Sequence, residues 1–332
     1  MYAYEKEVHN YYLEADKKHS LLARFSRNLN WCYVRGKLDP CYHRDDVIHT
    51  IQKILLRKNK ANILLTGSAG CGKTAIVEGL AAVVTEKKLQ YTRECLAADQ
   101  LNKAALARWE KNGMVGEKPT EIVPAKPPLC DAIIYEVSLN SMVSGTKYRG
   151  EFEERVADIL AECKRNPNII WFIDEGHHMS KVGAAEGSVS IGQILKPALA
   201  RRDICVISAT TAEEKAELLK DTAFARRFTE LEVPELQSDA VLDTATQILN
   251  NYCAYHNVTT QVQAKHLLSY VRSHLPNTVF PDNYINVVDE TLAGAVLDGE
   301  DTVKMCHFAN TLSRMTGHII LCAEDLSSQQ TG

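Results

Sequence analysis

The sequence lacks any apolar run long enough to cross a bilayer, since a membrane-spanning helix needs about 20 apolar residues in a row. Its first residues, Met1–Glu7, lack the apolar core of a secretory signal. The ten cysteines form no C-x-x-C pair, and the close histidine pair His177-His178 has no cysteine at metal-ligand spacing. We therefore expect a cytoplasmic chain with reduced thiols, no membrane segment and no zinc site.

An excess of charge of one sign is also missing. The chain has 38 basic and 42 acidic residues, and its formal net charge is −4. The nearest basic cluster, Arg57–Lys60, is more simply the solvated end of a helix. This balance argues against a general nucleic-acid or membrane binder. With 332 residues, 45% of them apolar, the chain is long enough for one large domain or two ordinary ones.

A glycine-rich motif is the strongest signal that is present. The apolar run Ile63–Leu65 leads into G-x-x-x-x-G-K-T at Gly67–Thr74, a pattern that predicts a buried strand, a phosphate-binding loop and the start of a helix. Lys73 would supply charge to the outer phosphates of ATP and Thr74 a hydroxyl to Mg²⁺, with the positive end of the helix aimed at the same anion. The predicted nucleotide-binding residues are Gly67, Ser68, Ala69, Gly70, Cys71, Gly72, Lys73, Thr74 and Ala75.

Two further apolar runs end in polar residues suited to the same site. Ile169–Ile173 is followed by Asp174, which would hold Mg²⁺ together with Thr74, and by Glu175, which would polarise the attacking water. Ile204–Ala209 is followed by Thr210-Thr211, where a hydroxyl can position that water or sense the γ-phosphate. The alternatives are a solvated acidic strand end and an ordinary strand-end threonine.

Arg226-Arg227 forms an adjacent pair of arginines beyond these runs. Such a pair can stabilise transition-state charge on the γ-phosphate held by a neighbouring subunit. Composition alone favours the simpler interpretation, a basic pair on the surface.

The order of the patterns predicts the fold class. Ala132–Val137 adds a further apolar run, and short buried strands that alternate with helices predict an α/β fold with a parallel sheet covered on both faces. Phosphate sites in such sheets lie at the carboxyl ends of the strands. After Ser238 the strand patterns stop, and helices at about 262–274, 281–297 and 301–315 predict a second, all-helical domain.

We divide the chain into a helical extension (1–35), a phosphate-loop domain (36–235), a helical domain (236–318) and a tail (319–332). The extension packs either on the main domain or on a neighbouring subunit. Residues 87–129 contain four prolines and are interpreted as a surface insertion. A helix from Ala75 to about Glu86 precedes the insertion. A separate helix over Asp99–Lys111, capped by Asp99 and ended by Gly113, is expected inside it.

Several strings together resemble one family, the Clp-type AAA+ ATPases. They are Gly36–Pro40, Gly72–Ala81, Lys147–Arg155, Ala184–Gly187, Leu195–Arg201 and Ala209–Thr211. The resemblance is to the first ATPase module of the ClpA, ClpB and ClpC unfoldases and disaggregases, over about residues 30–300. It implies an AAA+ P-loop sheet sandwiched by helices, a small helical lid, ATP hydrolysis with Mg²⁺, and a homo-oligomeric ring, expected to be a hexamer.

The resemblance also assigns roles. It makes Thr211 the nucleotide-sensing threonine and Arg226 and Arg227 the arginine fingers, beside the roles of Lys73, Thr74, Asp174 and Glu175 given above. It places Lys147, Tyr148 and Arg149 on an axial pore loop that grips a polypeptide, Gly183–Gly187 on a second pore loop, and Pro281-Asp282 at the start of a lid helix. A tyrosine ring suits this task because its face contacts any side chain. The alternative is a buried core tyrosine.

The chain also departs from the family pattern. Cys71 replaces a small aliphatic residue, and is either an oxidisable thiol in the phosphate loop or an inert small residue. Gly176 follows Glu175 where the family has an aliphatic residue, so a looser loop is expected there. Residues 87–129 are longer than the family equivalent. The amino-terminal adaptor domain, the coiled-coil middle domain and the second ATPase module of the family are not found in this sequence.

Three functions are carried forward. The first is an ATP-hydrolysing ring motor that remodels, unfolds or threads protein substrates, with an unidentified adaptor left open as a further partner. The second is a nucleic-acid-linked AAA+ switch or loader, which strongly salt-dependent DNA binding would favour. The third is a nucleotide-gated scaffold that assembles without threading, for which Tyr148 would be dispensable.

Overall fold

The computed structural model describes residues 2–144, 149–180, 182 and 190–321, and the chain forms two compact units. The first comprises Met1–Thr66 and Thr74–Glu232, and the second comprises Gly67–Lys73 and Val233–Gly332. In the described part of the chain, no helix combines the length and the apolar character that a bilayer crossing needs.

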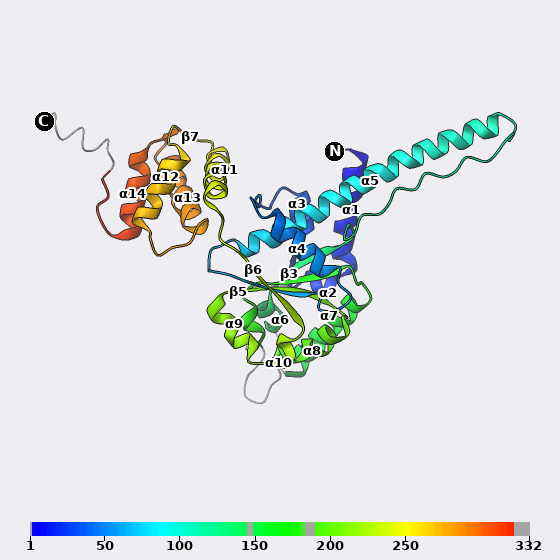
Figure 1. The fold of residues 1–332 in the computed structure, drawn as a ribbon, viewed down its shortest axis with the longest axis horizontal. Coiled ribbons are helices and arrows are strands. Elements are labelled where there is room, and N and C mark those ends of the chain that lie inside the picture. The colour runs from blue at the N-terminus through cyan, green and yellow to red at the C-terminus, as the bar shows by residue number, and fades with distance from the viewer. Residues whose placement is uncertain (1, 145–148, 181, 183–189, 322–332) are drawn as a thin grey trace. The chain divides into compact units, whose positions relative to one another are not determined.

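A six-stranded sheet forms the centre of the first unit (Figure 1). Its order is β1-β3-β4-β5-β2-β6, and every neighbouring pair is parallel except β1 with β3. All residues of β2 and β4 are buried, as the continuous apolar runs predict for a sheet covered on both faces. The strands are β1 Ser26–Asn28, β2 Asn62–Thr66, β3 Ile133–Val137, β4 Ile169–Ile173, β5 Cys205–Thr210 and β6 Phe228–Glu232.

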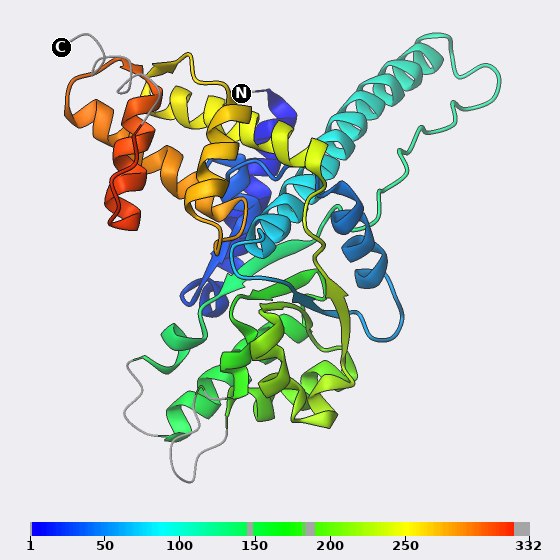
Figure 2. The ribbon, with the colours of Figure 1, turned by 60° about the vertical axis from the view of Figure 1, so that its left-hand side comes forward.

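Helices cover both faces of this sheet, which confirms the predicted α/β fold. Helices α4 (Asp45–Leu55) and α5 (Lys73–Lys111) lie on one face, and α7 (Arg149–Lys164), α8 (Ile191–Arg201) and α9 (Ala212–Leu219) on the other (Figure 2). Shorter helices complete the unit: α6 Leu139–Val143, the 3₁₀ helix η1 Gly176–Ser180, and α10 Thr222–Ala225.

The amino-terminal residues pack on the same sheet, although the sequence left a neighbouring subunit open. They form α1 (Ala3–Lys18), α2 (Ser20–Ala23), β1 and α3 (Leu29–Val34), and β1 adds an antiparallel strand to the edge of β3. The strand β1 was not predicted, since the sequence pattern indicates only helices in this segment. The buried Asn30 secures the attachment, because its amide oxygen accepts from the Ile134 N–H at 2.8 Å and its nitrogen donates to Thr85 Oγ1 at 3.0 Å.

The second unit is mainly helical, as predicted. Its helices are α11 Ser238–His256, α12 Ala264–His274, α13 Asp282–Leu297 and α14 Met305–Thr316. A short parallel ladder of β7 (Thr259–Thr260) and β8 (Thr302–Val303) joins them, which the all-helical expectation missed. Two-residue strands carry too little alternating pattern to be predicted from sequence.

Helix α5 is the largest departure from the expected elements. It runs without interruption from Lys73 to Lys111, so the expected end near Glu86 and the Asp99 cap are both wrong. Residues 87–99 contain neither glycine nor proline and are mostly good helix formers, so nothing stops the helix there. Beyond Thr85 its only buried residue is Ala98.

The outer part of α5 and the chain that returns beside it form an arm, defined here as residues 87–126, that projects from the sheet (Figure 1). The two segments hold each other, because the Asn102 side chain exchanges hydrogen bonds of 2.8 and 2.9 Å with the backbone of Ile122. At the base, Lys88 and Lys126 both pair with Asp131. The arm is therefore cross-linked within itself at Asn102 and contributes little to the core.

The loop after Asp174 and Glu175 is closely packed, contrary to the looser loop expected from Gly176. Gly176 begins η1 and is buried against β5. A Cβ atom at this position would lie 1.7 Å from Ser208 Oγ and 3.1 Å from Ser208 Cβ. Ser208 is itself fully buried, so the missing side chain at 176 makes room for the side chain present at 208.

Removing the arm should leave the fold intact. A chain in which residues 93–124 are replaced by a four-residue Gly-Ser linker should melt within about 2–4 °C of the parent, because surface changes cost little and about 1 kcal/mol corresponds to that shift in a domain of this size. Calorimetry of the two chains tests this. A much larger fall would show that the arm supports the core.

Gly176→Ala should lower the free energy of unfolding by about 1–3 kcal/mol, the usual cost of overpacking. Ser208→Gly in the same chain should recover part of that loss by removing the opposing atoms. Urea unfolding of the two single variants and the double variant measures the interaction. Gly150→Ala is the control, since a Cβ there meets nothing within 4 Å. Additive effects of the two substitutions would contradict the packing argument.

Candidate nucleotide site

The glycine-rich loop lies between the end of β2 at Thr66 and the start of α5 at Lys73, as predicted. Gly70 and Gly72 have φ values of +76° and +92°, in the left-handed region that a side chain disfavours. The Lys73 ammonium donates to the carbonyl oxygens of Gly67 at 3.0 Å and Ser68 at 2.9 Å, so the charge lies over its own loop.

Cys71 is 2% exposed. A buried thiol is shielded from oxidants in solution, which favours the inert small residue over the oxidisable thiol. All nine cysteines in the described residues are free thiols. Burial raises the pKa of several of them, to about 11 for Cys41, which keeps those groups protonated.

Thr74 and Asp174 meet directly. The Thr74 hydroxyl donates to Asp174 Oδ2 at 2.7 Å, although the two residues are 100 positions apart. Thr74 lies in the first turn of α5, and Asp174 follows the last residue of β4. A hydroxyl and a carboxylate are oxygen ligands of the kind that Mg²⁺ prefers, so the two residues fit the predicted metal role.

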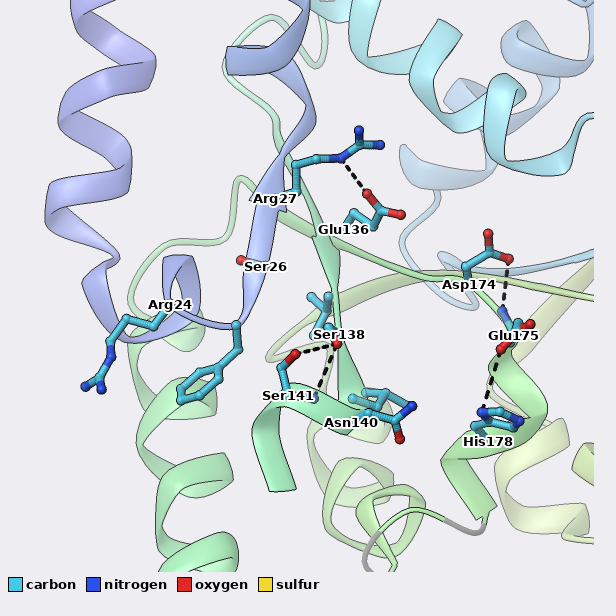
Figure 3. Close-up of a pocket in the computed structure, with 13 residues that line it drawn as sticks. Arg24, Ser26, Arg27, Glu136, Ser138, Asn140, Ser141, Asp174, Glu175 and His178 are labelled. Atoms are coloured by element: carbon cyan, nitrogen blue, oxygen red, sulfur yellow. Dashed lines mark hydrogen bonds and ion pairs between the residues drawn. The ribbon is translucent and has the colours of Figure 1, made fainter. Parts of the chain in front are cut away.

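Glu175 turns to the opposite side from Asp174 (Figure 3). Its backbone N–H donates to Asp174 Oδ1 at 2.9 Å, while its φ of +49° lies in the left-handed region. Non-glycine residues adopt this conformation at a cost, and such residues gather at functional sites. The Glu175 carboxylate points toward His178, with Oε2 3.8 Å from His178 Nδ1.

Thr211 caps helix α9. Its hydroxyl accepts from the Glu214 N–H at 3.3 Å, and its own N–H donates to Glu214 Oε2 at 3.1 Å. Glu214 also lies 3.2 Å from His177 Nδ1. Burial alone would raise the pKa of Glu214, but the hydrogen bonds from Thr211 and the neighbouring His177 hold it below its ordinary value. The Thr211 hydroxyl thus belongs to a network that reaches η1.

Sequence reasoning missed Glu214, His177 and His178. The pattern T-x-x-E at Thr211–Glu214 is a capping-box signature that identifies Glu214 from sequence. The two histidines follow the acidic pair after Gly176, and the sequence pattern points to them only as candidate metal ligands.

A cavity of about 510 Å³ borders this region at the carboxyl ends of β3 and β4. The amino-terminal strand β1 forms one wall, where Arg27 donates to Glu136 at 2.7 Å and to Glu78 at 2.6 Å. Glu175 and His178 lie on the opposite wall (Figure 3). The cavity therefore gives the Glu175 side chain, 70% exposed, room to move.

Arg226 and Arg227 lie elsewhere on the sheet. Both are exposed and directly precede β6, which runs parallel to β2 with Phe228 opposite Asn62. They are therefore at the amino ends of these strands, whereas Thr74 and Asp174 are at the carboxyl ends. A five-residue strand spans about 16 Å, so the length of the strands separates the backbone of the arginines from the backbone of the metal-ligand pair.

The residues predicted for the two pore loops lie mostly outside the described part of the chain. Lys147, Tyr148 and Gly183–Gly187 lie outside the described residues, and Arg149 is the first residue of α7. Pro281-Asp282 begins α13, as predicted for the lid helix. Within the second unit, a Cβ at Gly70 would lie 2.7 Å from Asp282 Cβ, so this helix start borders the glycine-rich loop.

Comparison with known proteins agrees with this geometry. A family model described as "ATPase family associated with various cellular activities (AAA)" matches residues 63–236. The chaperone protein ClpB of Aquifex aeolicus is 35% identical over 280 residues, covering 84% of this chain and 24% of that protein. The ATP-dependent Clp protease ATP-binding subunit ClpE of Bacillus subtilis is 34% identical over 275 residues, covering 82% of this chain and 34% of that protein.

Solved structures show the same similarity. An Hsp104–ADP complex of S. cerevisiae superposes with a TM-score of 0.68 at 26% identity, over 93% of this chain and 48% of that one. A closed-state reconstruction of Hsp104 with ATPγS and FITC casein has a TM-score of 0.69 at 28% identity, and the match covers 90% of this chain and 45% of that chain. The chain spans about a quarter to a third of the length of the ClpB and ClpE relatives. These matches confirm the resemblance found in the sequence: the chain belongs to the AAA family of ATPases and is similar to its Clp-type members.

Proposed function

We propose that this chain is an ATP-hydrolysing motor of the Clp type that works as a homo-oligomeric ring and remodels, unfolds or threads protein substrates in the cytoplasm. The observation that carries the proposed ATP hydrolysis is the 2.7 Å contact between Thr74 and Asp174. It brings the residue after the glycine-rich loop together with the carboxylate after β4, at the carboxyl ends of parallel strands. Membership of the AAA family supports the same assignment.

Each residue of the site has a chemical task in this proposal. The loop Gly67–Gly72 and Lys73 bind the phosphates of ATP, and Thr74 and Asp174 would hold Mg²⁺, which neutralises phosphate charge when bound. Glu175 accepts a proton from water as the water oxygen bonds to the γ-phosphorus, and the bond to the β–γ bridging oxygen breaks to release ADP and phosphate. Thr211 positions that water.

The position of the arginines supports the proposed ring. Arg226 and Arg227 lie at the end of the strands opposite to Thr74 and Asp174, so they would complete a site on a neighbouring subunit. We propose a hexamer, in which charge developing on the γ-phosphate of one subunit is stabilised by the next.

The protein substrate is proposed from two observations. The resemblance assigns Lys147, Tyr148 and Arg149 to a pore loop, and Arg149 is the first residue of α7. Two of the similar structures are of Hsp104 with casein, a polypeptide partner. Tyr148 would grip the polypeptide through its ring face, without a sequence requirement.

Glu175→Gln should keep ATP binding and slow hydrolysis by at least about 100-fold, since general-base catalysis is worth roughly 10²–10⁴ in rate. Lys73→Ala should lose ATP binding itself. Binding of a fluorescent ATP analogue and steady-state phosphate release separate the two effects. Hydrolysis at the parent rate in Glu175→Gln would show that Glu175 is not the base.

An unfolded polypeptide such as casein should stimulate ATP hydrolysis by the parent chain, and Tyr148→Ala should abolish that stimulation while leaving the unstimulated rate unchanged. Phosphate release is measured with the protein alone, with casein and with single-stranded DNA. Stimulation by DNA alone would favour the nucleic-acid switch. Indifference to both additions, with Tyr148 dispensable, would favour the scaffold.

A further inference from the structure

Strand β2 begins with a polar residue that its apolar run does not explain. Ile63–Leu65 are the apolar residues expected of a strand covered on both faces, but Asn62 carries a side-chain amide and is 5% exposed. A buried amide costs free energy unless its polar atoms are hydrogen-bonded, and asparagine is disfavoured in strands. Asn62 therefore needs specific partners in this fold.

Both partners of Asn62 are backbone groups, one on each side of β2. The amide oxygen of Asn62 accepts from the Val206 N–H of β5 at 3.0 Å, and its amide nitrogen donates to the Arg227 carbonyl oxygen at 3.2 Å. A backbone N–H can only donate and a carbonyl oxygen can only accept, so a side chain with both a donor and an acceptor is needed to satisfy the two. One side chain thus bridges the segments on both sides of β2, at the amino ends of the strands.

The carbonyl group that Asn62 holds belongs to the arginine pair. Arg226 and Arg227 are exposed, so the backbone from which their side chains extend decides where the guanidinium groups can reach. The Arg226 N–H donates to the Thr222 carbonyl oxygen at 3.2 Å, at the end of α10. The backbone of the pair is therefore held on one side by a short helix and on the other by a buried side chain of β2.

We propose that Asn62 is a positioning residue that fixes the backbone of Arg226-Arg227, so that the two guanidinium groups reach the γ-phosphate bound by a neighbouring subunit. The proposal rests on the proposed role of these arginines in a ring. Placement matters for such a task, because a displacement of about 1 Å can cost about 100-fold in rate. Asn62 lies at the amino end of β2 and the glycine-rich loop follows its carboxyl end, so Asn62 acts on the neighbour's site and not on its own.

Asn62→Ala should lower kcat for ATP hydrolysis by about 10- to 100-fold and leave the KM for ATP near the parent value, since the arginines act on charge that develops in the transition state. Asn166→Ala is the control and should keep the parent kcat. The Asn166 amide also donates to a backbone carbonyl oxygen, that of Glu162 at 2.8 Å, but it precedes β4, which β5 and β2 separate from β6. If Asn62→Ala melts below the assay temperature, Asn62→Asp replaces it, because an aspartate keeps the oxygen that accepts from Val206 and loses the donor to Arg227.

Mixed rings test on which site Asn62 acts. Asn62→Ala chains are co-expressed with Glu175→Gln chains, which lack the proposed base but keep both arginines, and rings that carry both chains are isolated through two different affinity tags. Hydrolysis should exceed the average of the two chains measured alone, because the base of one chain is completed by the arginines of the other. The double variant Arg226→Ala with Arg227→Ala should recover in the same way, and adding Asn62→Ala to it should cause no further loss.

An unchanged kcat in Asn62→Ala, or a rise in the KM for ATP in place of a fall in kcat, overturns the proposal for Asn62. A lack of recovery in its mixed rings, while the arginine double variant does recover, overturns it as well, since Asn62 would then act on its own site. If the arginine double variant hydrolyses ATP at the parent rate, or no ring carries both chains, the proposed function of the arginines fails and the positioning role fails with it.

Discussion

The parallel pairing of the central strands is the constraint on which the site depends. Strand β5 lies between β2 and β4, with Thr66 opposite Thr210 and Ile173 opposite Ser208. Because parallel strands end at the same edge, the residues that follow them are brought together from distant parts of the chain. A change of direction in any of these strands would remove its polar group from the edge, and the Thr74–Asp174 contact could not form.

The same pairing separates the arginines from the site. Arg226 and Arg227 precede β6 and so lie at the other end of the strands. In the proposed chemistry, the groups at the carboxyl edge of the sheet act together with the arginines of a neighbouring chain, so that chemistry would require assembly. The amino-terminal strand β1 has a complementary effect, since it covers the β3 edge and forms one wall of the cavity in which Glu175 rests.

The segment after the acidic pair shows how local packing adapts a shared fold. Gly176 lets η1 lie directly against β5, where Ser208 occupies the space that a side chain at 176 would need. This close approach fixes the start of η1 and brings His177 within reach of Glu214. The two sides of the site are therefore connected through η1 as well as through the sheet.

The sequence by itself determined the phosphate loop, the acidic pair, the parallel α/β sheet and the helical second unit, because each depends on a local pattern: glycine spacing, continuous apolar runs or helical periodicity. Local patterns gave the wrong prediction at α5. Residues with high helix propensity lie on both sides of position 87, and they do not indicate whether one helix or two would form. Only the tertiary structure decided the pairing of β1 with β3 and the orientation of the Glu175 side chain toward His178. It also decided the packing in which the Ser208 side chain fills the space that a side chain at Gly176 would need. These features arise from contacts between segments far apart in the chain, or from a backbone conformation that such contacts hold, and no local pattern encodes them.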